Sequence, residues 1–311
     1  MAQRALPPSI AAPRPRWTRR QRRSLLTGLL FISPWIVGFL VFQLYPFLAS
    51  FYYSFTFYPI LDTPRFIGLT NYQNLLNDPR FQTALGNSAY FAFFAVPLGT
   101  IISVLLAMLL NTKTRGVSIF RTIFFLPSIT PVVATAIVWL WMFNPRAGII
   151  NYVLEMVGIR GPGWLGSPEW AKPALIIISI WGVGNAVLIY LAALQDVPRE
   201  LSEAAQVDGA NRLQQTWHIT IPMISPVILF NIVTGLIGSF QYFTEVHVMT
   251  GGSGRPADST LMLSIYLWQS AFQYFKIGYA SAQAWVLFLI IISFTVVLFR
   301  ISGRFVYYGG K

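Results

Sequence analysis

The chain has 311 residues, of which 55% are hydrophobic and 10% are charged, and its mean hydropathy is +0.58. This composition excludes an ordinary soluble domain and predicts a protein that crosses a membrane several times. The sequence contains no cysteine, which excludes disulfides and thiolate metal sites. A net charge of +12 could indicate nucleic-acid binding, but the positions of the basic residues favour another explanation.

Basic residues precede the first apolar segment. Residues 1–24 are rich in proline and arginine and are predicted to form a disordered cytoplasmic tail. The last arginines of this tail favour an anchor that starts on the cytoplasmic side of the membrane, and a nucleic-acid-binding arm is a less favoured alternative. The first span is predicted at 25–55, and with an external loop it makes up a region over 25–84. The span is too long for the core of a signal peptide, so we expect it to remain uncleaved.

Five further apolar segments are long enough to cross about 30 Å of hydrocarbon. They lie at 85–110, 119–143, 174–194, 223–248 and 277–301. Two prolines, Pro127 and Pro131, are expected to bend the start of the second of these five segments. A short amphipathic helix is predicted near 149–157. We expect residues 85–302 to form a five-helix core and residues 303–311 a short tail.

The basic residues also predict the orientation of the spans. With six spans, both termini lie on one side of the membrane. That side carries fifteen of the lysines and arginines, and the other side carries seven. The positive-inside rule therefore places both termini in the cytoplasm, and the basic residues there would also attract anionic lipid. Nucleic acid is not needed to explain the charge.

A polar segment at 195–222 separates two of the apolar spans. Asp196 can cap a first helix in this segment, and Gly209 can break the chain after it. Asn211 can then cap a second helix, which Pro222 is expected to end. The result is a short bent pair of helices outside the lipid, although the chemistry alone fits an ordinary polar loop equally well.

Several residues in this segment occur at the fixed spacing of a known motif: Glu203, Ala204, Ala205, Asp208, Gly209, Ala210, Trp217, Ile219 and Pro222. The segment resembles the EAA loop of ABC importer permeases. In that family the loop is a coupling helix that docks into a cleft of the ATPase subunit. The resemblance therefore implies a role in ATPase coupling for Glu203, Ala204, Ala205, Asp208, Gly209 and Pro222. It covers nearly the whole chain and is strongest to sugar-type permeases related to the maltose and glycerol-3-phosphate importers.

The sequence shows no chemistry of its own for ATP hydrolysis or catalysis. It has no G-x-x-x-x-G-K-[ST] loop, so this chain is not expected to bind ATP by that route. His218 and His247 fall on opposite sides of the predicted membrane, which argues against a metal pair. We expect a transport subunit without a cofactor, with ATP and Mg²⁺ bound by a partner ATPase.

Polar residues inside apolar spans suggest a path for the substrate, because they are costly in lipid and tend to face a bundle interior. The resemblance implies substrate contacts from the spans before and after the coupling loop, and the corresponding residues include Gly182, Asn185, Ser239 and Tyr242. Glu245 joins the predicted path as an acid inside the span that follows the loop. Neutral hydrogen-bonding groups and aromatic rings suit a sugar. Hydrogen bonds between helices are the structural alternative for each of these residues.

The resemblance implies an all-α membrane protein with six transmembrane helices and a cytoplasmic EAA coupling helix, the fold of type I ABC importer permeases. It would reside in the bacterial inner membrane and move a neutral di- or oligosaccharide by alternating access. Its partners would be a second, distinct permease subunit, two ATPase subunits and an extracytoplasmic solute-binding protein. The alternatives are a glycerol-3-phosphate or glycerophosphodiester permease and, from another class, a self-sufficient secondary carrier.

Overall fold

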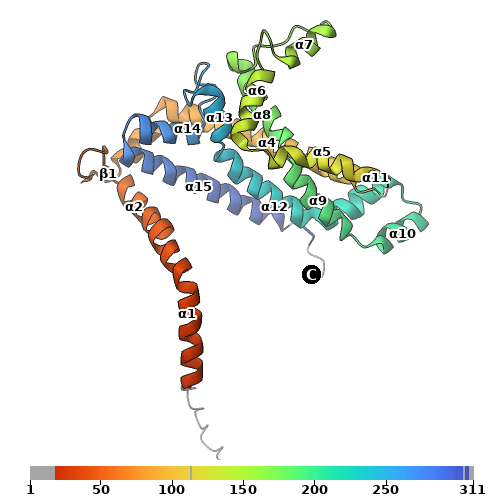
Figure 1. Ribbon diagram of the computed structural model, residues 1–311, viewed down its shortest axis with the longest axis horizontal. Helices are drawn as coiled ribbons and strands as arrows, with labels where there is room; N and C mark the ends of the chain where they lie inside the picture. The colour runs from red at the N-terminus through yellow and green to blue at the C-terminus, as the bar shows by residue number, and fades with distance from the viewer. Residues whose placement is uncertain (1–17, 113, 304, 308–311) are drawn as a thin grey trace, which may run out of the picture. The chain divides into compact units, whose positions relative to one another are not determined.

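A computed structural model describes residues 18–112, 114–303 and 305–307, and the described chain is predominantly helical (Figure 1). The predicted disordered tail thus falls largely outside the described residues. The chain divides into two compact units, one up to Tyr52 and the other from Tyr53 onward. The second unit holds every element discussed as a candidate site.

The first unit is a helical segment without a core of its own. It contains α1 (Arg19–Phe39), a π-helical turn (Leu40–Leu44) and most of α2 (Tyr45–Ser54). Helix α1 starts before the predicted position 25 because Thr18 and Gln21 form a capping box, in which each side chain accepts a hydrogen bond from the other residue's backbone N–H. No residue of α1 is buried, as expected for apolar side chains that face lipid.

A small hairpin and a short helix begin the second unit. Strands β1 (Thr56–Phe57) and β2 (Arg65–Phe66) pair antiparallel, and α3 (Thr70–Leu76) follows. The Asn71 amide donates to the carbonyls of Ser54 and Thr56, at 2.9 and 2.8 Å, and so holds α3 to the hairpin. These elements pack against α15, whereas the sequence suggested grouping them with the first span.

Two spans are single helices. Helix α4 (Pro79–Leu110) and helix α15 (Ile277–Ser302) end within one residue of the predicted positions. Helix α4 starts earlier than predicted because Asp78 caps it, accepting a hydrogen bond from the Arg80 N–H at 2.9 Å. By length and composition, four helices of the described chain can cross a membrane, or six if each of two bent pairs forms one span, which agrees with the six predicted spans.

Two spans are broken into bent pairs. Helices α5 (Val117–Ile129) and α6 (Val132–Met142) meet at 100°, and α8 (Pro168–Trp181) and α9 (Gly184–Gln195) meet at 46°. The first break follows from Pro131, which forces the preceding Thr130 into an extended conformation. Pro127 lies inside α5 without ending it. The second break, at residues 182–183, was not predicted.

The fifth span continues through its prolines. Helix α11 (Arg212–Gln215), a π-helical turn (Thr216–Thr220) and α12 (Ile221–Phe240) form one helical segment that leads into α13 (Thr244–Thr250). The prediction that Pro222 ends this helix is therefore wrong, and the helix also continues through Pro226. Pro222 occupies the first turn of α12, where proline is tolerated. Pro226 has no N–H for the carbonyl of Pro222, and the Ser225 hydroxyl donates to that carbonyl instead, at 2.6 Å.

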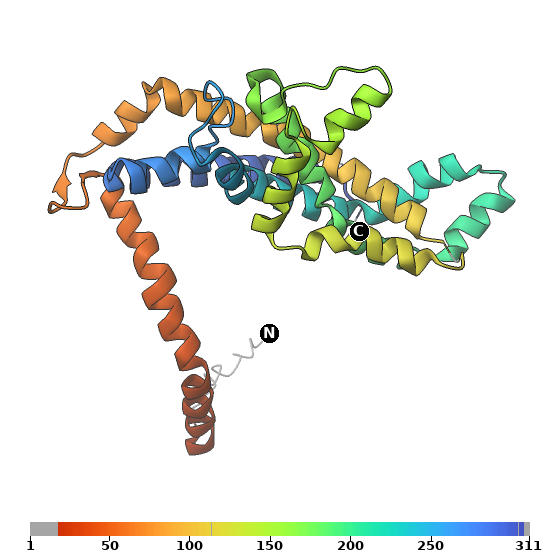
Figure 2. The same ribbon diagram turned by 45° about the horizontal axis from the view of Figure 1, so that its top comes forward.

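The remaining elements connect the spans. They are α7 (Ile149–Met156), which confirms the predicted short helix, a 3₁₀ turn (Trp164–Gly166), α10 (Arg199–Val207), α14 (Leu263–Trp268) and a π-helical turn (Gln269–Gln273). Helix α4 is central to the second unit, where it packs against α8, α9, α12 and α14 (Figure 2). One buried cluster surrounds its first half and includes Phe81 and Phe91, and another surrounds its last turns around Leu110.

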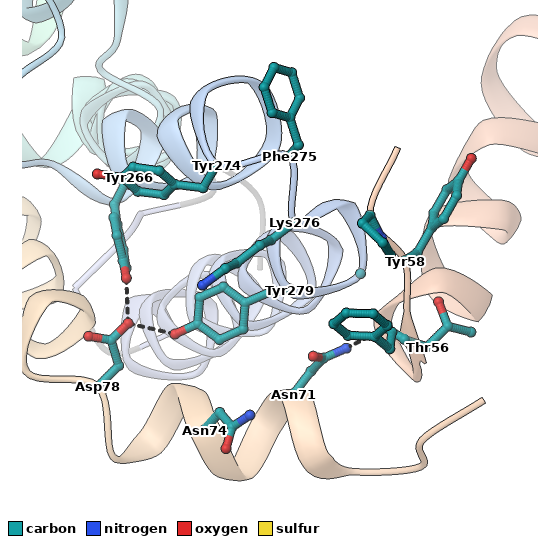
Figure 3. A pocket seen from close by; sticks show the side chains of 13 residues that line it. Thr56, Tyr58, Asn71, Asn74, Asp78, Tyr266, Tyr274, Phe275, Lys276 and Tyr279 are labelled. Atoms are coloured by element: carbon teal, nitrogen blue, oxygen red, sulfur yellow. Dashed lines mark hydrogen bonds between the residues drawn. The ribbon is translucent and has the colours of Figure 1, made fainter. Parts of the chain in front are cut away.

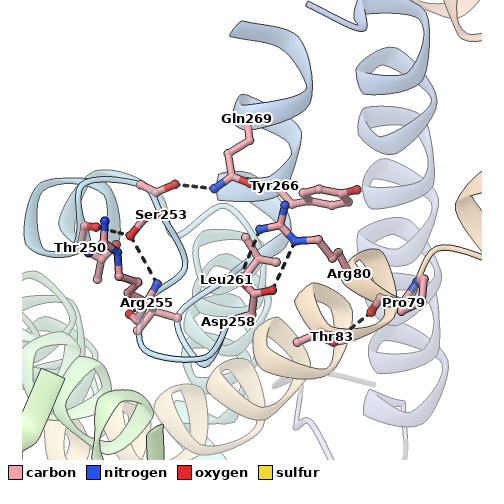
Figure 4. A network of polar contacts seen from close by, with 12 residues as sticks. Pro79, Arg80, Thr83, Thr250, Ser253, Arg255, Asp258, Leu261, Tyr266 and Gln269 are labelled. Carbon is pink, nitrogen blue, oxygen red and sulfur yellow. Dashed lines mark hydrogen bonds and ion pairs between the residues drawn. The ribbon is translucent and has the colours of Figure 1, made fainter. Parts of the chain in front are cut away.

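A polar network fixes the loop before α14 to the start of α4 (Figure 4). Arg80 forms an ion pair with Asp258 at 3.3 Å, and the Asn87 amide donates to the carbonyls of Asp258 and Leu261. The buried Gln269 amide donates to the Gly252 carbonyl at 2.6 Å. The loop is therefore held by contacts to both α4 and the turn after α14.

Asp78 joins three helices at this end of the unit. The hydroxyls of Tyr266 and Tyr279 donate to its Oδ2 atom, at 2.5 and 2.6 Å. Burial alone would raise the pKa of Asp78, but the hydrogen bonds from both tyrosines and from backbone N–H groups outweigh burial and lower the pKa. The ionised carboxylate thus connects the start of α4 to α14 and α15.

The Asp78→Asn substitution tests this connection, because asparagine can still cap α4 but carries no charge. Hydrogen bonds to a charged group contribute about 1.5–3 kcal/mol each. We expect Asp78→Asn to lower the free energy of unfolding by about 2 kcal/mol, and Asp78→Ala to lower it by about 1 kcal/mol more because the cap is also lost. Unfolding in detergent measures both, and equal stability of the two variants would contradict the capping contribution.

The lowered pKa also predicts a pH dependence. A carboxylate whose pKa is lower in the folded state stabilises fully above its unfolded-state pKa of about 3.9, and this stabilisation is lost as the pH falls through the folded-state pKa. The stability difference between the wild type and Asp78→Asn should therefore shrink below about pH 4. A difference that widens in that range would contradict the assignment.

Candidate functional site: a polar groove and an exposed helical segment

A groove of about 720 Å³ lies between α4, the α8–α9 pair and α12. Its polar lining consists of Thr100, Ser103, Ser179, Asn185, Tyr190, Asn231, Thr234 and Ser239. The residues of the described chain that line the groove include no Asp, Glu, Lys, Arg or His. A charged ligand would therefore find no counter-charge on these walls, whereas a neutral polar ligand would find hydrogen-bonding groups.

The break between α8 and α9 forms one wall of the groove. Gly182 follows the last turn of α8, and Asn185 lies in the first turn of α9, so the 46° bend falls between them. Gly184 permits the close approach of α9 to α5, because an added Cβ would lie 2.6 Å from the Phe124 carbonyl oxygen. The bend thus places Gly182 and Asn185 on the groove.

The polar groups of the groove remain available to a ligand. The side chains of Asn185 and Ser239 form no hydrogen bond with any described residue. Ser103 and Ser179 donate to carbonyls of their own helices, at 2.6 and 2.7 Å, which leaves each hydroxyl oxygen free to accept. The groove therefore offers both donors and acceptors.

The five residues predicted for the substrate path divide into two groups. Gly182, Asn185 and Ser239 line the groove together. Tyr242 does not, because its ring stacks on Phe91 with the centroids 4.5 Å apart. Glu245 lies in the first turn of α13, which packs against α6.

Sequence reasoning missed the contribution of α4. Gly99, Thr100 and Ser103 line the groove from this helix. A signal was present, because Thr100 and Ser103 are polar residues three apart within an apolar span and share a helix face. Phe230 on α12 was also missed, and it is the exposed aromatic ring of the groove, with 57% of its surface accessible.

The second candidate region is the segment between α9 and α12, which projects beyond the neighbouring helices in both views (Figures 1 and 2). Helix α10 ends in a Schellman motif. The Gly209 N–H donates to the Gln206 carbonyl at 3.1 Å and the Ala210 N–H donates to the Ala205 carbonyl at 2.8 Å. Gly209 has a φ of +84°, so the predicted break at this glycine is confirmed.

The two predicted caps have different outcomes. Asn211 forms a capping box with Gln214, with hydrogen bonds of 2.8 and 2.9 Å, as predicted. Asp196 does not cap α10, so that prediction is wrong. It ends α9 instead, and α10 begins after Pro198 without any side-chain cap.

No residue of α10, α11 or the π-helical turn is buried, and most of this segment is exposed. Glu203 and Val207 lie four residues apart on one face of α10, and 89% of the Val207 surface is accessible. Ala205, Asp208 and Gly209 line a recess of about 330 Å³, whereas Glu203, Ala204 and Pro222 lie outside it. Leu213 and Trp217 are also exposed, so several apolar side chains lie on the surface of this segment.

The profile of one protein family matches residues 95–306, and its description is "Binding-protein-dependent transport system inner membrane component". The chain belongs to this family. It is therefore a membrane transport component rather than an enzyme, and it is a multi-pass inner-membrane protein. This membership confirms the resemblance on which the fold prediction depends.

Individual relatives span almost the whole chain. The chain is 41% identical to the probable ABC transporter permease YesP of Bacillus subtilis, over 94% of this chain and 96% of YesP. It is 40% identical to the lactose transport permease LacF of Rhizobium radiobacter, over 86% and 90% of the two chains. It is 32% identical to the trehalose/maltose permease MalF of Thermococcus litoralis, over 91% and 95%.

The fold also has a close structural neighbour. A chain in the crystal structure of a bacterial alginate ABC transporter, in complex with a periplasmic protein that binds an alginate pentasaccharide, superimposes with a TM-score of 0.79. The identity is 25%, and the match covers 91% of this chain and 96% of that chain. The predicted all-α ABC importer permease fold is thereby confirmed.

The Gly209→Ala substitution tests the turn between α10 and α11. A Cβ at a positive φ costs about 1–2 kcal/mol, so we expect the Schellman motif to open and amide exchange to rise over residues 199–215. Gly158→Ala is the matched control, because Gly158 has a φ of +78° and equally open surroundings in another segment. If exchange at 199–215 is the same in both variants, the turn does not depend on Gly209.

Proposed function

We propose that the chain is a permease subunit of an ATP-driven importer, which moves a neutral di- or oligosaccharide from a binding protein across the inner membrane by alternating access. The observation that carries this proposal is the groove, whose walls are hydrogen-bonding and uncharged. Together with α4, the helices that directly precede and follow the exposed segment at α10 and α11 line this groove.

The chemistry of the groove favours a sugar. Sugar hydroxyls need donors and acceptors, which Asn185, Asn231 and Ser239 supply, and the apolar face of a sugar ring can stack on Phe230. The names of relatives agree, because they include lactose, trehalose/maltose and arabinooligosaccharide permeases. The structural neighbour belongs to a transporter of an acidic polysaccharide, but an acidic ligand would have no basic partner on the walls of this groove.

The exposed segment supports a docking role. An ATPase subunit that binds α10 would cover Val207 and the recess beside Gly209, and an acidic Glu203 could pair with a basic group of that subunit. ATP and Mg²⁺ would bind to a pair of such ATPase subunits, because the chain has no phosphate-binding loop. The excess of basic residues on this side supports cytoplasmic termini.

The helix connections suggest how movement reaches the groove. Helix α9 carries Asn185 and ends directly before the link to α10. On the other side, α11 continues into α12, which carries Ser239 in its last turn. A displacement of α10 by closing ATPase subunits would therefore move two walls of the groove. A second, distinct permease subunit would supply the opposing half of the path.

The test is reconstitution of the complete transporter with candidate ATPase, permease and binding-protein partners. We expect one sugar from a panel of lactose, trehalose, maltose and arabinobiose to stimulate ATP hydrolysis. Asn185→Ala should raise the apparent KM for uptake several-fold, since each lost hydrogen bond contributes about 0.5–1.5 kcal/mol. Leu188→Ala on the same helix lies outside the groove and should have no such effect. Uptake driven by an ion gradient without an ATPase would contradict the proposal.

Charge reversal at Glu203 tests coupling. We expect Glu203→Lys to fold normally, because the side chain is exposed, but to separate ATP hydrolysis from uptake. The measured quantity is the amount of sugar imported per ATP hydrolysed. Glu155→Lys on α7 is the control, since it reverses another exposed acid on a different helix. Normal uptake per ATP in Glu203→Lys would show that this acid is not needed.

A further inference from the structure

A second concave site lies where β1, α3, the turn after α14 and the start of α15 meet (Figure 3). Its volume is about 520 Å³, and it shares no lining residue with the groove. The elements around it belong to the side of the membrane that the positive-inside rule predicts to be external. Neither the coupling of ATP hydrolysis nor the groove accounts for it.

The floor of this pocket is a preformed hydrogen-bonded layer. Both tyrosine hydroxyls, of Tyr266 and Tyr279, donate their protons to Asp78. Their oxygens can therefore only accept hydrogen bonds from a ligand. Tyr266 is buried, and the Asp78 carboxylate beneath it already accepts both hydrogen bonds. The two tyrosine oxygens of this floor are therefore acceptors held in fixed positions.

The rim of the pocket is aromatic and held in place. The surface of the Tyr274 side chain is 45% accessible, and Arg80 fixes its hydroxyl by donating to it at 3.0 Å. The next residue, Phe275, has a φ of +53°, which is a strained conformation for a bulky side chain. The chain adopts it between Tyr274 and Lys276, both of which line the pocket.

Two polar side chains at the rim remain free to bind. Neither the Asn74 amide nor the Lys276 ammonium group forms a hydrogen bond with any described residue, and both side chains are exposed. Figure 3 shows the Lys276 side chain reaching across the pocket toward the side where Tyr279 and Asp78 lie. The site thus combines an aromatic ring, free donors and fixed acceptors.

We propose that this pocket binds one sugar unit of the transported saccharide outside the membrane-spanning groove. A sugar ring would stack on Tyr274, donate hydroxyl protons to the tyrosine oxygens of the floor, and accept from Asn74 and Lys276. The inference rests on the proposed function for the identity of the ligand. Aromatic residues at a lipid interface are the alternative, but such residues need no hydrogen-bonded carboxylate below them.

The experiment is saturation-transfer NMR on the assembled transporter in phosphatidylcholine nanodiscs, without binding protein. The probe is the sugar that stimulates ATP hydrolysis in the panel above, or lactose if none does. We expect saturation transfer from the wild type, and a loss of at least about threefold in Tyr274→Ala and Asn74→Ala, because the loss of ring stacking or of one hydrogen bond weakens binding by about this factor. Tyr274→Phe should retain most of the signal, since it keeps the ring and loses only the contact with Arg80.

Matched controls separate this pocket from other sites. Tyr152→Ala removes an exposed tyrosine on α7 and should leave the signal unchanged. Asn185→Ala removes the contribution of the groove, and the signal that remains should fall when Tyr274→Ala is added. A signal that is lost in Asn185→Ala but kept in Tyr274→Ala would place the sugar in the groove alone, and would overturn the inference while leaving the proposed function intact. No signal from the wild type would also overturn it.

A protein-docking role is the remaining outcome. If Tyr274→Ala weakens binding of the sugar-free binding protein by the same factor as it weakens the sugar signal, the rim is a protein contact and the inference is wrong. Failure of every sugar to stimulate ATP hydrolysis would instead count against the proposed function, since that assay does not depend on Tyr274.

Discussion

In hydrocarbon, backbone N–H and C=O groups have no water to pair with, so a span can bend only where other parts of the protein satisfy or shield the freed groups. This constraint determines where the groove can form. The break at residues 182–183 lies where Gly184 lets α9 pack closely on α5. At Pro226 the Ser225 hydroxyl takes the place of the missing N–H, and the helix continues. The span formed by α8 and α9 is thus bent, whereas the span that contains α12 is continuous, and both contribute walls to the groove.

The continuous and bent helices have different consequences for the exposed segment. Helix α12 is joined to α11 through a π-helical turn, so a force on α11 can act along a helical connection. Helix α9 is joined to α10 by a short non-helical link at Val197 and Pro198. The Schellman motif at Gly209 and the capping box at Asn211 fix the angle between α10 and α11 by local hydrogen bonds. A partner that binds α10 would therefore act on both groove walls through a segment whose own shape is defined.

Local signals in the sequence predicted much of this arrangement, and non-local contacts explain the rest. The ends of α4 and α15, the turn at Gly209 and the cap at Asn211 depend on residues a few positions apart. Asp196 has a good capping side chain, yet it is the C-cap of α9, and α10 begins only at Arg199, with Pro198 at its N-cap position. The contact between Asp78 and Tyr279 joins residues 201 positions apart, so no local pattern could predict the second pocket. The residues predicted for the groove came only from the spans on either side of the motif, so the contribution of α4 was not predicted.

Several charged residues of the second unit lie near the start of α4 and not on the walls of the groove. Near the start of α4, Arg80 pairs with Asp258, and Asp78 is held by two tyrosines. Lys172 donates to Asn87 at 3.0 Å and lies 5.1 Å from the ring centre of Tyr90. These groups hold helix ends and a loop together through contacts with neighbouring side chains. The walls of the groove along α4, α9 and α12 carry only neutral donors and acceptors, so binding of a neutral polar ligand there would not require a charged side chain to be removed from water.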